Sequence, residues 1–143
     1  MDKFSDPTPI ATVEAYAKAL KAVRDEFSRE RPFIESTELK MLRVHYDAPK
    51  HTLTTTQLAE GVELTSYSVA NLRYGTLAHR IADKLGYRPG PFDTGTAEAP
   101  HWWRTLAYGN DGMPLTDDGF YEWVMRPELC TALEQMGWVG RRR

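Results

Sequence analysis

Residues 54–85 read TTTQLAEGVELTSYSVANLRYGTLAHRIADKL, and they carry the clearest signals for the architecture of this chain. Thr54 is followed three places later by Gln57, a spacing typical of a capping box. We therefore expect a short helix over about 55–60 and a longer helix over 66–85. A short helix, a tight turn and a second helix are the layout of a helix-turn-helix motif.

The longer helix also carries signals for its ends and its buried side. Ser66 can cap its start, and Gly86 suits the left-handed conformation that ends many helices. We expect its buried stripe to consist of apolar residues at helical spacing: Val69, Leu72, Leu77, Ile81 and Leu85. The same core should include Leu39, Leu42 and Leu58.

Segments on the N-terminal side of this motif are also helical in pattern. Thr8 and Pro9 suit the start of an amphipathic helix over 9–28. A second helix is expected over 37–46, because Pro49 disfavours helix at the residue before it.

The C-terminal part of the chain has a different pattern. Residues 101–108 and 120–125 favour two strands that pair as an antiparallel hairpin, and Pro127 opens a last helix over about 127–136. The expected fold class is α+β: a mainly helical, winged helix-turn-helix-like domain over 36–143. Residues 1–35 form an N-terminal amphipathic helix and connector.

Length and composition indicate one globular domain. The chain has 143 residues, of which 41% are hydrophobic and 27% are charged. It has no apolar run long enough to span a bilayer and no secretion signal, so no membrane partner is expected. A single cysteine, Cys130, favours a reducing, cytoplasmic setting.

The net charge of −2 is unevenly distributed. Residues 65–88 carry a net charge of +3, whereas residues 89–140 carry −6. A weakly acidic protein lacks the broad positive field that non-specific nucleic-acid binding requires. The basic segment favours local contact with DNA, and the acidic segment favours a protein partner.

The helix 66–85 supplies the candidate site. In helix-turn-helix proteins the start of the second helix enters the major groove, where Asn reads adenine and Arg reads guanine. Basic side chains further along can contact phosphates. The predicted DNA-binding residues are Ser66, Tyr67, Ser68, Asn71, Arg73, Tyr74, Arg80, Lys84 and Arg88.

Structural explanations compete with these functional ones. Tyr67 and Tyr74 could be packed in the core, and Asn71 could bond to the backbone. Gly75 lies inside the helix, where close approach of another helix would explain it. The aromatic residues 102–123 should divide between the core, which is favoured, and an exposed platform for a base or a protein.

Signals for catalysis are weak. The four histidines are scattered, and no carboxylates accompany them in a metal-binding pattern. Cys130 fits a buried apolar role better than that of a nucleophile, and no phosphate-binding glycine loop occurs. We expect no enzyme activity, no catalytic residues, no metal site and no cofactor.

Several segments together resemble a known module. They are 41–49 (MLRVHYDAP), 54–59 (TTTQLA), 71–78 (NLRYGTLA), 125–129 (MRPEL), 132–134 (ALE) and 137–139 (GWV). This set is similar to the winged helix-turn-helix-like module on the N-terminal side of bacterial and phage HNH-type endonucleases, including restriction-related ones. The HNH catalytic motif has no counterpart among these residues.

The resemblance implies DNA recognition rather than catalysis. The expected partner is double-stranded DNA, either unmodified or modified, for a targeting module of restriction or mobile-element origin. The alternative is a phage or mobile-element anti-defence protein, such as an anti-CRISPR, that inhibits a bacterial defence complex through protein contact. The helix 9–28 could also form a homodimer interface.

Overall fold

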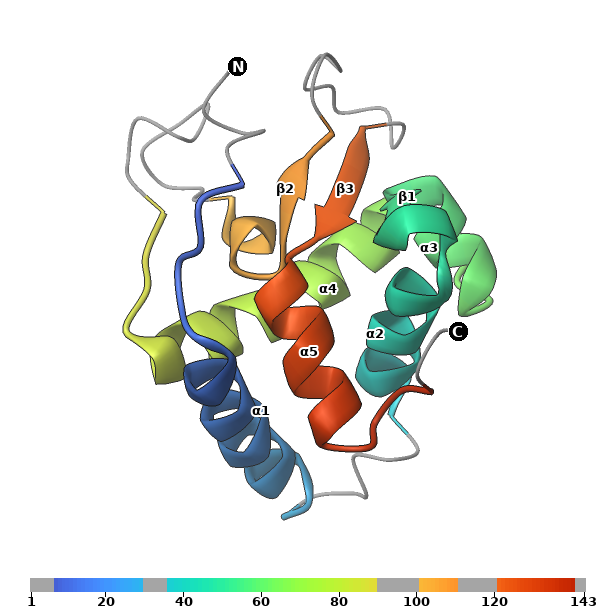
Figure 1. Ribbon diagram of the computed structural model, residues 1–143. Helices are drawn as coiled ribbons and strands as arrows, with labels where there is room; N and C mark the ends of the chain where they lie inside the picture. The colour runs from blue at the N-terminus through green and yellow to red at the C-terminus, as the bar shows by residue number, and fades with distance from the viewer. Residues whose placement is uncertain (1–6, 30–35, 90–100, 111–120, 141–143) are drawn as a thin grey trace.

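The computed structural model describes residues 7–29, 36–89, 101–110 and 121–140 (Figure 1). Within these ranges the chain forms five α-helices, two 3-10 helices and three strands. In chain order they are α1 (Val13–Phe27), α2 (Thr37–Asp47), η3 (Pro49–His51), β1 (Thr52–Thr54), α3 (Thr55–Gly61), α4 (Tyr67–Leu85), η5 (Trp102–Thr105), β2 (Ala107–Gly109), β3 (Glu122–Met125) and α5 (Pro127–Gln135). The expected α+β class, mainly helical with a small antiparallel sheet, is confirmed.

Local capping signals set the ends of the central helices. The Thr54 side chain accepts a hydrogen bond from the Gln57 backbone, and the Gln57 side chain accepts one from the Thr54 backbone. The Ser66 hydroxyl caps α4 at its start. Gly86 ends α4 with a φ of 72°, a conformation that glycine adopts without steric cost. These predicted boundaries are confirmed to within a residue.

Two predictions outside this motif need correction, and one strand was missed. The first helix begins at Val13 rather than Pro9, because Thr12 supplies the cap. Residues 101–108 are not one strand: η5 occupies most of the segment, and β2 begins only at Ala107. The strand β1 was not predicted.

The three strands form one antiparallel sheet in the order β1-β3-β2. The expected hairpin pairing of β2 with β3 is confirmed, with Tyr108 opposite Val124. β1 pairs with the other edge of β3, where Leu53 lies opposite Trp123. The central strand therefore joins the strand before α3 to the C-terminal part of the chain.

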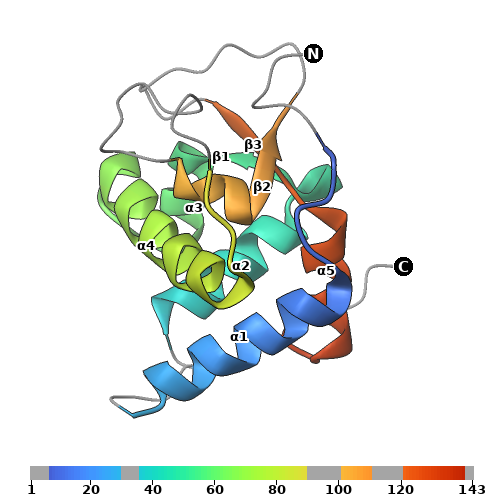
Figure 2. The same ribbon diagram turned by 90° about the vertical axis from the view of Figure 1, so that its left-hand side faces the viewer.

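The helix α1 packs across α4 and α5, as Figure 2 shows. Its buried face consists of Tyr16, Ala19, Leu20 and Val23. The Tyr16 hydroxyl donates a hydrogen bond to the Thr105 carbonyl over 2.6 Å. Because this apolar face is buried within the chain, a homodimer through α1 would have to use its polar face.

The buried stripe of α4 differs from the predicted one. Val69 is 38% exposed and Leu72 is 70% exposed, so both expected core residues face outward. The stripe that is buried consists of Ala70, Tyr74, Leu77, Ala78, Ile81 and Ala82. Alanines on this side allow α1 and α3 to approach α4 closely, and they leave the larger Leu72 on the opposite side.

Aromatic side chains fill the space between the sheet and α4. The rings of Trp103 and Trp123 stack with centroids 5.4 Å apart, and Tyr74 stacks on Trp123 at 6.0 Å. Tyr121 contacts the edge of Trp103. Trp102 faces the other way and stacks on His79. The expected core role is therefore confirmed for Trp103, Tyr121 and Trp123, whereas Trp102 and Tyr108 are half-buried and Phe120 lies outside the described ranges.

Candidate nucleic-acid interface

The first turns of α4 present an exposed surface directly after the turn from α3. We define the outer face of α4 by six exposed residues: Tyr67, Ser68, Val69, Asn71, Leu72 and Thr76. None of these side chains carries a formal charge. The surface therefore combines hydrogen-bonding groups with methyl groups, which suits contact with base edges or with a protein.

Five of the nine predicted site residues occupy the start of this helix or its flank. Ser66 is half-buried, and its hydroxyl is engaged with the Val69 backbone N–H over 3.3 Å. Tyr67, Ser68 and Asn71 are exposed. Arg73 lies on the flank of the helix. The geometry therefore brings these side chains together, although their role remains a prediction.

Tyr74 was predicted to contact DNA, and this prediction is wrong. Its side chain is fully buried, and its hydroxyl lies 2.8 Å from Nδ1 of His45. Burial also raises the pKa of the Tyr74 hydroxyl well above its usual value. Tyr74 is part of the core because it lies on the side of α4 that faces the sheet.

Arg73 is engaged with a carboxylate of α2. Its Nη2 lies 3.1 Å from Oε2 of Glu38, and Nε donates to the same oxygen over 3.3 Å. The Glu38 side chain is only 10% exposed, whereas the Arg73 side chain is 32% exposed. The guanidinium thus ties α4 to α2, and contact with a DNA base would compete with this ion pair.

Arg80 and Lys84 share one carboxylate of α1. Nη2 of Arg80 lies 3.1 Å from Oε1 of Glu26, and Nζ of Lys84 donates to Oε2 of the same residue. Hydrogen bonds from Lys84 and then from Arg80 lower the pKa of Glu26. The guanidinium of Arg80 also lies over the Phe27 ring, 4.4 Å from its centroid. Both predicted phosphate contacts are therefore paired within the chain.

Arg88 follows the end of α4 and is exposed. Its guanidinium carbon lies 5.6 Å from the centroid of the Trp102 ring. That ring stacks on His79 with centroids 3.8 Å apart and an interplanar angle of 7°. The stack holds Arg88 near the C-terminal half of α4, away from the outer face.

His45, one of the four histidines that are scattered in the sequence, is a hydrogen-bonded residue of the core. It is fully buried, and its two ring nitrogens contact the Tyr74 hydroxyl and the Trp123 carbonyl. Burial lowers the pKa of His45 to about 4. Its place between Leu42 and Tyr46, on the apolar side of α2, is the feature of the sequence that indicates its burial.

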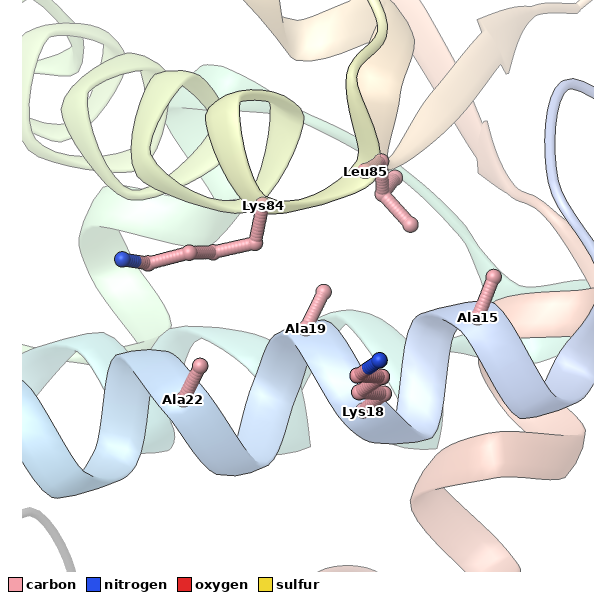
Figure 3. A pocket seen from close by; sticks show the side chains of 6 residues that line it. All are labelled: Ala15, Lys18, Ala19, Ala22, Lys84 and Leu85. Carbon is pink, nitrogen blue, oxygen red and sulfur yellow. The ribbon is translucent and has the colours of Figure 1, made fainter.

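A shallow groove of about 220 Å³ lies between α1 and α4 (Figure 3). Its lining consists of Ala15, Lys18, Ala19, Ala22, Lys84 and Leu85. The small side chains of α1 form the floor, and the ammonium groups of two lysines lie at the margin. Lys84 extends along α4 toward Glu26 rather than into the groove.

The described part of the chain contains no group of three or more His, Cys, Asp or Glu side chains that could hold a metal ion. Cys130 is buried, as expected, and burial raises its pKa to about 12. Among the described helices, none has the length and apolar character needed to cross a membrane. No protein-family model, curated protein or solved structure matches this chain.

Proposed function

We propose that this chain is a double-stranded DNA-binding module of the winged helix-turn-helix type. The observation that carries the proposal is the outer face of α4, which lies directly after a capped short helix and a tight turn. This is the position from which a recognition helix enters the major groove. The module would serve as the targeting part of a restriction or mobile-element system.

The order of elements supports this proposal. The sequence α2–β1–α3–α4–β2–β3 places a helix-turn-helix between the first strand and a β hairpin. All three strands belong to one antiparallel sheet with β3 in the middle. In a winged module the tip of the hairpin lies beside the recognition helix, which would add a second point of contact to the duplex.

The chemistry of the outer face suits base edges better than phosphates. An Asn71 amide can both accept from and donate to adenine, and the Ser68 hydroxyl can contact any base. Methyl groups of Leu72 and Val69 match the apolar C5 substituents of pyrimidines in the major groove. Three basic residues are predicted phosphate contacts: Arg80, Lys84 and Arg88. Within the described ranges, Arg88 is exposed and no ion pair with a carboxylate is seen for it.

A second candidate function is inhibition of a bacterial defence complex through protein contact. It is favoured by the large exposure of Leu72, together with the exposure of Val69 one turn before it. Exposed apolar clusters on a folded domain mark interaction sites. The sequence between β2 and β3 adds Asp111, Asp117 and Asp118 without any Lys or Arg, which disfavours phosphate contact there.

Fluorescence anisotropy on a random-sequence duplex pool tests the first proposal. The assay is run at about 50 mM salt, because phosphate contacts weaken steeply as salt rises. One pool contains unmodified cytosine and a second contains modified cytosine. Asn71→Ala should weaken binding to the preferred duplex by about 1–3 kcal/mol.

Gln135→Ala is the matched control, because it removes an exposed amide from the end of α5. It should leave the affinity unchanged. If the wild-type protein binds neither pool at low salt, the DNA-binding proposal fails. Inhibition of a defence complex would then become the leading hypothesis.

A further inference from the structure

We propose that Glu26 of α1 competes with DNA phosphate for Arg80 and Lys84, so that α1 restrains DNA binding by this module. The inference rests on the proposed function and adds a mode of regulation to it. It concerns two cations that are predicted phosphate contacts and that form ion pairs with a carboxylate of the same chain.

The carboxylate of Glu26 occupies both cations at once. Oε1 accepts from Nη2 of Arg80 over 3.1 Å, and Oε2 accepts from Nζ of Lys84. Each oxygen therefore serves one donor, as two oxygens of a phosphate group would. Arg80 and Lys84 lie four residues apart and so project from the same flank of α4. A phosphate could use this pair of donors without any change in α4.

The ion pair is accessible to a competing anion. The side chains of Arg80, Lys84 and Glu26 are 38%, 35% and 30% exposed, so none of them is sealed in the core. Exchange of one anion for another at such a site requires only side-chain rotation. Because exposed ion pairs contribute little to folding stability, loss of the pair should leave the fold intact.

Because Glu26 lies at the end of α1, a movement of this helix end would change how strongly Glu26 competes with phosphate. Glu26 and Phe27 form the end of α1, and both contact the guanidinium of Arg80. The carboxylate lies 54 and 58 residues from its two partners in sequence. A change in α1 that withdrew this last turn would release both cations of α4 together, without altering the outer face.

Glu26→Gln removes the competing charge and keeps the size of the side chain. Asp25→Asn is the matched control: it neutralises an adjacent acidic residue of α1, which forms an ion pair with Arg24 over 3.2 Å. Both variants have the same net charge, so the general attraction to DNA is equal. Duplex affinity is measured by anisotropy at several salt concentrations, and elution from heparin serves as a second anion readout. Thermal melting checks that each variant is folded.

We expect Glu26→Gln to bind duplex DNA about three- to tenfold more tightly than Asp25→Asn at low salt. The slope of log affinity against log salt should steepen by about one to two units, because each newly engaged phosphate adds about 0.9. Adding Lys84→Ala to Glu26→Gln should remove most of this gain.

The outcomes separate this inference from the proposed function. If the wild-type protein binds DNA but the two variants bind equally, the competition is disproved and the function stands. If no variant binds duplex DNA but Glu26→Gln elutes from heparin at higher salt than Asp25→Asn, the anion site stands and the function fails. Equal behaviour in both assays, with no DNA binding, overturns both.

Discussion

The Tyr74 hydroxyl of α4 lies 2.8 Å from Nδ1 of His45 on α2, in the fully buried core. The other ring nitrogen of His45 lies 3.0 Å from the Trp123 carbonyl of β3. A carbonyl only accepts, so Nε2 carries the proton and Nδ1 accepts from Tyr74. One neutral imidazole thus connects two helices and the central strand.

The buried imidazole makes stability depend on pH. His45 has a pKa of about 4 in the folded protein and about 6.5 when unfolded, so the unfolded chain binds the proton more readily between these values. The contribution of neutral His45 is complete above pH 6.5 and is lost as the pH falls toward 4. The free energy of unfolding should drop by about 3 kcal/mol over this range. Urea unfolding at several pH values measures it.

A variant isolates this effect from the titration of carboxylates. His45→Gln removes the titrating group and should cost about 1–3 kcal/mol at pH 7, because buried partners lose a hydrogen bond. Its stability should change less between pH 6.5 and pH 4 than that of the wild-type protein. An equal pH dependence in both proteins would rule out His45 as the cause.

Two leucines of α4 should respond differently to truncation. Leu77 is 1% exposed, so Leu77→Ala should lower the free energy of unfolding by about 2–5 kcal/mol. Leu72 is 70% exposed, so Leu72→Ala should change it by no more than about 0.5 kcal/mol. Chemical denaturation of both variants measures the difference. A large loss for Leu72→Ala would place that side chain in the core instead.

Two glycines offer a similar contrast. A Cβ atom at Gly75 would meet no other atom within 4 Å, which also shows that the expected close helix packing there was wrong. Gly75→Ala should stabilise the protein by up to about 1 kcal/mol through helix propensity. At Gly109 a Cβ atom would overlap the Tyr121 hydroxyl, so Gly109→Ala should destabilise it by about 1–3 kcal/mol. Melting temperatures that move in the same direction for both variants would contradict this.

Arg88 and Asn71 should affect DNA binding in different ways. Arg88→Ala removes an exposed cation, so it should weaken binding to all duplexes alike and lower the salt slope by about one unit. Asn71→Ala should weaken binding to the preferred sequence alone. Contacts to bases determine which DNA sequence is bound, whereas contacts to phosphates only orient the protein on the duplex. Salt titrations on preferred and scrambled duplexes compare the two. Identical profiles for both variants would refute this division of roles.

We also expect the purified chain to leave DNA intact. The sequence lacks a clustered set of metal ligands and a recognisable nucleophile–base pair. Incubation of plasmid DNA with the protein, with Mg²⁺, Mn²⁺ or a chelator, should yield no cleavage product. Metal-dependent cleavage that disappears in a His45 or His51 variant would disprove the expectation.

Local signals explain which parts of the fold could be predicted. The capping box at Thr54 and Gln57 and the left-handed Gly86 act within one helical turn, so the sequence alone locates those helix ends. β1 gave no such signal, because three residues form a strand only through pairing with β3. The segment from His101 was misassigned because its aromatic residues favour strands, whereas tertiary packing places them in a 3-10 turn.

In the candidate site, too, some features follow from local sequence and others depend on tertiary contacts. Ser68 and Asn71 are exposed polar residues in the first turns of α4, where the sequence predicted them. Burial of Tyr74 and exposure of Leu72 depend on which neighbours α4 has, and the buried side mixes three alanines with larger residues. Pairing of Glu26 with Arg80 joins residues 54 positions apart, which no local pattern reveals.

The central place of β3 has a consequence for how the chain acquires its structure during synthesis. β1 and β2 both pair with β3, and α1 packs on α5. Segments near the N-terminus therefore need β3 and α5 to complete their contacts. While the ribosome is still translating residues before Glu122, His45 and Tyr74 lack the strand that completes their environment. Helices made early must therefore keep apolar surface exposed until the C-terminal segment emerges. We therefore expect α2, α3 and α4 to complete their packing only after β3 has been synthesised.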